Sequence, residues 1–82
     1  MWVKAMSARR NIAGERIRLA RLAEKPPATQ KDISARLSVN GIILSDSSIG
    51  KIEHGTAAVT DIQLKAFAKV LKVKMAWLLK EE

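Results

Sequence analysis

The chain has 82 residues, 48% of them hydrophobic, and contains no cysteine. A chain of this length forms about one small domain, and the lack of cysteine excludes disulfide bonds and thiolate metal sites. No hydrophobic run is long enough to span a bilayer or to act as a secretory signal, so we expect no membrane partner and a cytoplasmic location. The 15 lysines and arginines outnumber the 8 acidic residues, which gives a formal net charge of +7.

The positive charge is concentrated in the first half of the chain. Residues 1–41 hold nine basic and three acidic residues, whereas residues 42–82 hold six and five. Every arginine lies at or before Arg36. Such an excess is typical of proteins that bind polyanions, although a basic surface also serves solubility. Charge alone therefore favours a nucleic-acid partner without establishing one.

Apolar residues recur at spacings of three and four and never alternate in the manner of strands, which predicts an all-α chain. The strongest pattern is the run of Leu64, Phe67, Ala68 and Leu71. We predict helices over about residues 9–24, 29–38, 45–54, 60–71 and 73–79, with Trp77 or Leu78 closing the core. Residues 9–80 would form one five-helix domain, preceded by an N-terminal arm of residues 1–8.

Stop and start residues mark the boundaries between these helices. Pro26-Pro27 ends the first helix, because proline biases the residue before it away from helical angles. Asn40-Gly41 suits positive φ and predicts a turn after the second helix. Asp32, three residues after Thr29, is a short version of the capping-box acid. The predicted N-cap residues are Thr29, Ser45 and Thr60.

Several short motifs occur in an order that is typical of one family. They are Arg16-Ile17-Arg18, Arg21, Thr29-Gln30-Lys31-Asp32-Ile33, Ile49-Gly50-Lys51-Ile52-Glu53-His54-Gly55 and Leu71-Lys72-Val73-Lys74-Met75-Ala76-Trp77-Leu78-Leu79. With these motifs the chain resembles the Cro and phage-repressor (XRE-like) type of helix-turn-helix domain over about residues 9–79. The resemblance implies an all-α, compact five-helix domain of the lambda-repressor type with a central helix-turn-helix.

The resemblance also implies a site on double-stranded DNA. The second helix would cross the DNA backbone, and the third, about residues 45–54, would lie in the major groove. A partly buried ion pair between Arg21 and Glu53 would join the first helix to the third. The family often has glutamine at the start of both helices; Gln30 matches the first, whereas Asp46 departs from the second. The reading side would hold Ser45, Asp46, Ser47, Ser48 and Lys51.

The residues themselves leave alternatives open. Asp46 either stabilises the helix start through the helix dipole, the interpretation that we favour, or accepts a hydrogen bond from cytosine N4. At least one of the three serines should cap the helix. Gly50 costs about 1 kcal/mol relative to alanine inside a helix, and either a close approach to DNA or drift would explain it. Gln30 could bind phosphate, steady a reading side chain or be solvated, and Lys51 could contact guanine or phosphate or be solvated.

Six cations are candidates for phosphate contacts, although not all of them can face one side of the domain. They are Arg9, Arg10, Arg16, Arg18, Lys31 and Arg36.

Two further features bear on the site. His54 has no second ligand or nucleophile at a useful spacing, so we interpret it as a helix-end residue. The connection of residues 39–44 is longer than is usual in the family, so the reading helix could have a different tilt.

We therefore expect a transcriptional regulator that binds double-stranded DNA, with repression favoured over activation. We expect it to bind as a homodimer, since one short helix offers few base contacts. No enzyme, cofactor or metal is expected. The alternative is a protein-interaction module of antitoxin or anti-repressor type, in which Trp2, Val3 and Met6 or residues 75–77 contact a protein partner. RNA binding ranks third, because few aromatic residues are present for base stacking.

Overall fold

The computed structural model describes residues 10–82, which contain α-helices and no strand. The prediction of an all-α fold with five helices is confirmed for this part of the chain. The N-terminal arm, with Trp2, Val3 and Met6, and the phosphate-contact candidate Arg9 lie outside the described residues. The helices are α1 (Gly14–Leu22), α2 (Gln30–Val39), α3 (Asp46–His54), α4 (Asp61–Leu71) and α5 (Met75–Leu78).

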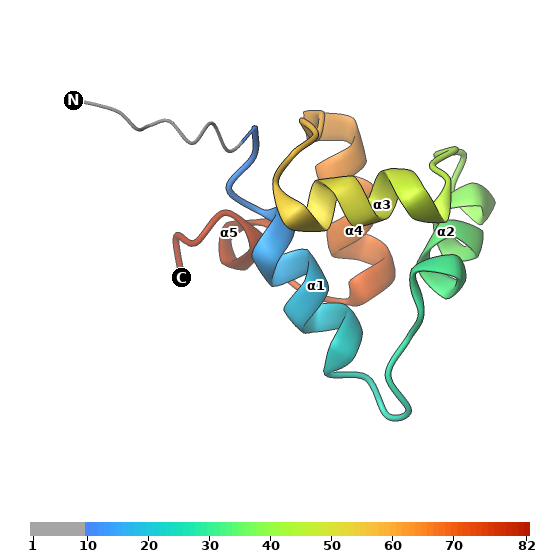
Figure 1. Cartoon of the computed structure of the whole chain (residues 1–82). Helices are drawn as coiled ribbons and strands as arrows, with labels where there is room; N and C mark the ends of the chain where they lie inside the picture. Colours follow the sequence, from blue (N-terminus) through green and yellow to red (C-terminus); the bar gives the residue numbers. More distant parts are fainter. Residues whose placement is uncertain (1–9) are drawn as a thin grey trace.

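The helices surround one apolar core (Figure 1). Helix α3 runs across the front of the molecule and packs on α1 and α2, whereas α4 lies behind it and packs on α1, α2 and α5. In α5, Leu78 is fully buried and Trp77 is only half-buried. No helix of the described part is long and apolar enough to cross a membrane. The most deeply buried side chains are Phe67, Ile17, Ile33, Leu37, Ile49 and Leu78.

The three predicted N-caps are confirmed. The hydroxyl of Thr29 accepts the N–H of Asp32 at 3.0 Å, and the Asp32 carboxylate accepts the N–H of Thr29 at 2.9 Å. These hydrogen bonds hold the pKa of Asp32 below its ordinary value. Thr60 forms the corresponding capping box with Gln63, and Ser45 caps α3. Because each cap joins residues three positions apart, local sequence was enough to locate the starts of α2, α3 and α4.

The predicted start of the first helix was wrong. Helix α1 begins at Gly14 and not near Arg9. The side-chain oxygen of Asn11 accepts the backbone N–H groups of Ala13 at 3.0 Å and Gly14 at 2.6 Å, which caps the helix at this point. The last helix is also shorter than predicted, because the N–H of Val73 bonds to the end of α4.

The long connection between α2 and α3, residues 40–45, is held against α2. The N–H of Ile42 donates to the carbonyl of Leu37 at 3.0 Å, with Gly41 at φ 81°. The hydroxyl of Ser34 donates to the carbonyl of Leu44 at 2.6 Å. Asn40 keeps a negative φ of −96°, so only the glycine of the Asn-Gly pair has the predicted positive φ.

Helices α1 and α3 come together at a glycine. A Cβ atom added to Gly14 would overlap the carbonyl oxygen of Ile52. The oxygen belongs to the backbone of α3, and the added Cβ atom would be bonded to the backbone of α1. Neither atom can move without shifting a helix. Gly14 is therefore required for the close packing of the start of α1 on the end of α3.

We expect Gly14→Ala to destabilise the fold by about 1–3 kcal/mol, because overpacking outweighs the gain in helix propensity. The matched control is Gly50→Ala in α3, where the added Cβ would lie 3.3 Å from the flexible end of Gln30. This control should change the free energy of unfolding by less than about 1 kcal/mol. Urea unfolding followed by circular dichroism measures both; a stabilised Gly14→Ala variant would contradict the close approach.

Candidate nucleic-acid interface

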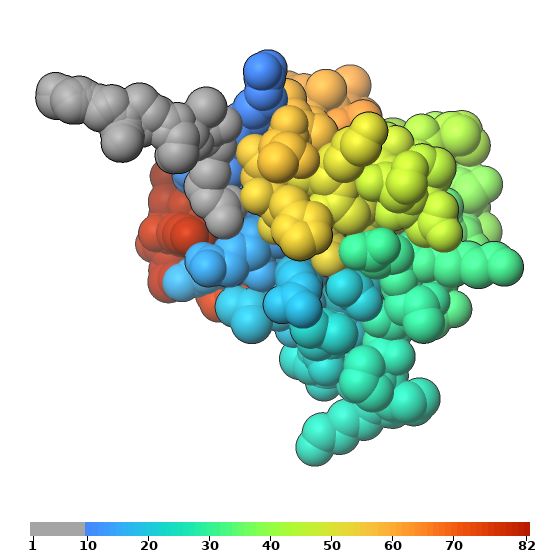
Figure 2. All heavy atoms as spheres, in the orientation of Figure 1, coloured from blue at the N-terminus to red at the C-terminus, as the bar shows by residue number. Residues whose placement is uncertain are grey.

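Helix α3 has a buried face and an exposed face. Ile49 and Ile52 are 0% and 2% exposed and point into the core. Residues three and four positions apart share one side of a helix. Figure 2 shows α3 at the surface of the molecule, above α1 and the start of α2. We name its outer side the α3 stripe, which consists of Ser47, Gly50, Lys51 and His54.

The N-terminus of α3 is polar and exposed. The hydroxyl of Ser45 accepts the N–H of Ser48 at 3.1 Å and lies 2.9 Å from the Ser48 hydroxyl. One carboxylate oxygen of Asp46 accepts the N–H of Ser47 at 2.9 Å. This bond agrees with the favoured interpretation of Asp46 as a helix-start residue. Its second oxygen can still accept a further hydrogen bond.

The expected ion pair between Arg21 and Glu53 forms, and it is more deeply buried than predicted. Arg21 Nε and Nη2 donate to the two oxygens of Glu53 at 2.8 and 2.9 Å, and the side chains are 10% and 2% exposed. Arg21 Nη1 also donates to the carbonyl of Ala28 at 2.9 Å. Hydrogen bonding to Glu53 raises the pKa of Arg21 above its ordinary value. The pair fastens α3 to α1.

Gln30 contacts the buried ion pair, which sequence analysis did not predict. Its Nε2 donates to Glu53 at 3.2 Å, which adds α2 to the ion pair. The amide lies over Gly50, where a Cβ atom would stand 3.3 Å from it. The structure thus provides a reason for Gly50 that sequence did not suggest, since the missing side chain leaves room for Gln30. Gln30 is a positioning residue that sets α2 against α3.

Sequence reasoning missed Asn11, which also holds the C-terminal end of α3. Its Nδ2 donates to the carbonyls of Ile52 at 3.1 Å and Ala57 at 2.7 Å. The backbone N–H of Arg10 donates to the carbonyl of Gly55 at 2.8 Å. An asparagine shortly before a helix was a recognisable cap signal, but its long-range partners were not visible in the sequence.

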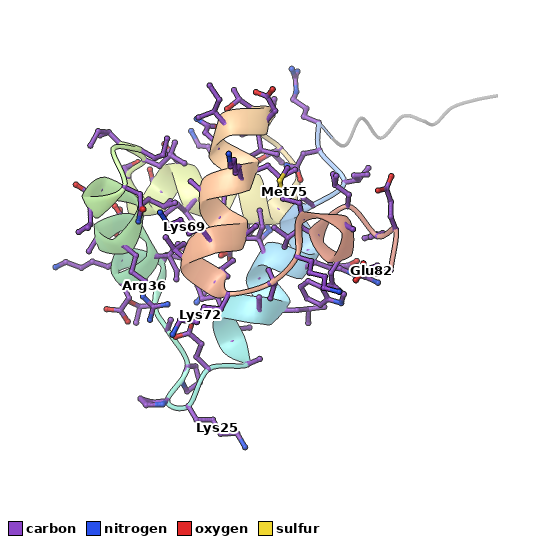
Figure 3. The ribbon with its side chains drawn as sticks, turned by 180° about the vertical axis from the view of Figure 1, so that it is seen from behind. Lys25, Arg36, Lys69, Lys72, Met75 and Glu82 are labelled. Carbon is purple, nitrogen blue, oxygen red and sulfur yellow. The ribbon has the colours of Figure 1, made fainter. Side chains whose placement is uncertain are left out.

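The candidate phosphate contacts divide into two groups. Arg16 is engaged at the C-terminal end, where Nη1 donates to the carbonyl of Trp77 at 2.6 Å and the guanidinium lies 4.9 Å from the Trp77 ring. Arg36 pairs with Glu24 at 2.7 Å on the back of the molecule (Figure 3). Both arginines thus make contacts within the domain, and their interpretation as phosphate contacts stays a prediction.

Other cations stay exposed and lie nearer to α3. Arg18 on α1 and His54 at the end of the α3 stripe line the same hollow of about 480 Å³. Lys31 is exposed in the first turn of α2, and the side chain of Arg10 is exposed beside the end of α3. Sequence analysis treated His54 only as a helix-end residue. Arg18, Lys31 and Arg10 thus come from α1, from α2 and from the segment before α1, and α1 and α2 are helices that pack on α3.

No family model matches the chain, and no curated protein or solved structure matches it significantly. Within residues 10–82, no group of three or more His, Cys, Asp or Glu side chains is placed to hold a metal ion. The function must therefore be inferred from the residues and their arrangement.

We expect Arg21→Ala to destabilise the fold by about 3–5 kcal/mol, because Glu53 would remain buried without its cation. The matched control is Arg36→Ala, which breaks a pair whose side chains are 39% and 30% exposed. That change should cost about 0–1 kcal/mol. Arg21→Lys, which keeps the charge but loses the planar fork, should fall between them. Chemical denaturation measures the free energy of unfolding of each variant. Equal losses of stability in the two alanine variants would contradict the special role of the buried pair.

Proposed function

We propose that this protein is a transcriptional regulator that binds double-stranded DNA, with α2 and α3 as a helix-turn-helix and α3 in the major groove. The observation that carries the proposal is the two-sided character of α3. Its inner face is fixed by the Arg21–Glu53 ion pair, and its outer face presents an exposed polar N-terminus and Lys51. A major groove accepts one α-helix, and rigidly held side chains read base edges best.

The side chains at α3 suit contact with bases and phosphates. Lys51 can donate to guanine O6 or N7, and Asp46 can accept from cytosine N4. The hydroxyls of Ser47 and Ser48 can bind either a base or a phosphate. The exposed cations on either side of α3 would contact the sugar-phosphate backbone and so orient the helix. They are Arg10, Arg18 and Lys31.

Two copies would read more sequence than one. Helix α3 has nine residues, and a single short helix contacts few base pairs. A homodimer would place two such helices on a pseudo-palindromic site. Repression then follows when the site overlaps a promoter.

The rival function is a module that binds a protein partner. It is favoured by a hollow of about 540 Å³ between α1, α4 and α5, whose lining includes Leu19, Ala23, Val73 and Trp77. Leu19 is 53% exposed, so part of this apolar surface is open. The same surface could instead serve the homodimer, and the response of DNA affinity to salt discriminates between the two functions.

We expect the affinity for duplex DNA to fall steeply as salt rises, because bound phosphates release counterions. With about four phosphate contacts per copy, affinity per copy should fall about a hundredfold from about 50 to about 200 mM salt. A fluorescence-anisotropy titration of a random duplex at several salt concentrations measures this. A flat response would exclude DNA binding and favour the protein-interaction module.

We expect Lys51→Ala to weaken binding to the best site by about 1–3 kcal/mol and to relax the preference at one base position. Arg18→Ala should instead weaken all sequences by a similar factor, because phosphates carry no sequence information. The matched control is Lys69→Ala, which removes an exposed lysine on the back of the molecule (Figure 3) and should leave binding nearly unchanged.

The best site for this comparison comes from selection of bound sequences from a random library. All three variants must first melt like the parent protein. If Lys51→Ala weakens specific and random DNA by the same factor, Lys51 contacts phosphate and base reading belongs to Asp46, Ser47 and Ser48.

A further inference from the structure

The connection between α2 and α3 exposes one large apolar side chain beside the start of α3. Ile43 is 81% exposed, whereas its neighbours Ile42 and Leu44 pack against the core. Such alternation is typical of extended backbone, in which successive side chains point to opposite sides. Ile43 precedes Ser45, the N-cap of α3, by two positions. Figure 1 shows this connection at the N-terminal end of α3.

Hydrogen bonds on both sides of Ile43 hold its backbone in place. The N–H of Ile42 donates to the carbonyl of Leu37 at 3.0 Å. The carbonyl of Leu44 accepts the hydroxyl of Ser34 at 2.6 Å. An isoleucine is also stiff at χ1. The side chain is therefore presented to solvent by a fixed backbone.

The outer side of α3 lacks a methyl-bearing side chain for the C5 methyl group of a thymine. Thymine differs from the other bases in the major groove through its C5 methyl group, which requires an apolar partner. None of the four residues of the α3 stripe, Ser47, Gly50, Lys51 and His54, offers a methyl group. Adenine is usually read by asparagine or glutamine, but Gln30 at this surface is bonded to Glu53.

We propose that Ile43 packs on the C5 methyl group of a thymine and so specifies a T·A pair next to the bases that α3 contacts. This inference rests on the proposed function, because it places the N-terminus of α3 in the major groove. It adds a specificity-determining residue from outside the helix.

The setting of Ile43 fits a single methyl group better than a protein partner. Protein contact sites are contiguous apolar patches of several hundred square ångströms. Ile43 stands between Gly41 and Ser45, both exposed and without a large apolar side chain. Val39, which is 88% exposed at the end of α2, lines instead a hollow with Lys69 and Lys72 on the back of the molecule.

The test replaces each thymine of the selected site in turn by deoxyuridine, which removes only the methyl group. For the parent protein we expect a loss of about fourfold at one position of each half-site, the value of one buried methyl group. Ile43→Ala should bind the best site more weakly and become insensitive to that replacement. The matched control Val39→Ala should behave as the parent protein does. Both variants should melt like the parent, since both side chains are exposed.

The outcomes separate this inference from the function on which it rests. If the parent protein shows no salt-dependent binding to duplex DNA, the proposed function fails and the inference fails with it. If the protein binds DNA but Ile43→Ala keeps the parent's sensitivity to deoxyuridine, or no position requires thymine, only the inference is overturned. A change in self-association of Ile43→Ala in sedimentation, without any thymine dependence, would assign Ile43 to a protein contact instead.

Discussion

The buried ion pair between Arg21 and Glu53 is the constraint on which the position of α3 depends. A buried carboxylate is costly unless its charge is paired and its oxygens are hydrogen-bonded. Arg21 meets this need with two parallel hydrogen bonds, and Gln30 adds another from α2. Because the three side chains come from α1, α2 and α3, the requirement of one carboxylate sets the arrangement of three helices.

The C-terminal end of α3, which carries Glu53, is held by backbone contacts as well. Asn11 bonds to backbone carbonyls at the end of α3, and Gly14 allows the start of α1 to touch the carbonyl of Ile52. Backbone contacts of this kind permit no larger side chain and little sliding. Helix α3 is thus fixed near its C-terminal end, while its outer surface is left to side chains with no part in the core.

The cations of the molecule serve two purposes. Arg16 and Arg36 hold the C-terminal end and the back of the domain through carbonyls, an aromatic ring and a carboxylate. Arg18, Lys31 and Lys51 stay exposed on or near the α3 face. Net charge alone therefore overstates the charge available to a polyanion, because part of it is used in folding.

Sequence by itself determined the helical class and the starts of α2, α3 and α4, because the caps at Thr29, Ser45 and Thr60 bond to residues only three positions away. Motif order was enough to indicate the Arg21–Glu53 pair. The start of α1 was equally local, because Asn11 caps residues two and three positions away, although sequence reasoning missed this signal. Tertiary structure alone decided what the amide nitrogens of Asn11 and Gln30 bind. Asn11 and Gln30 have partners 41 and 23 positions away, and periodicity carries no information about contacts over such separations.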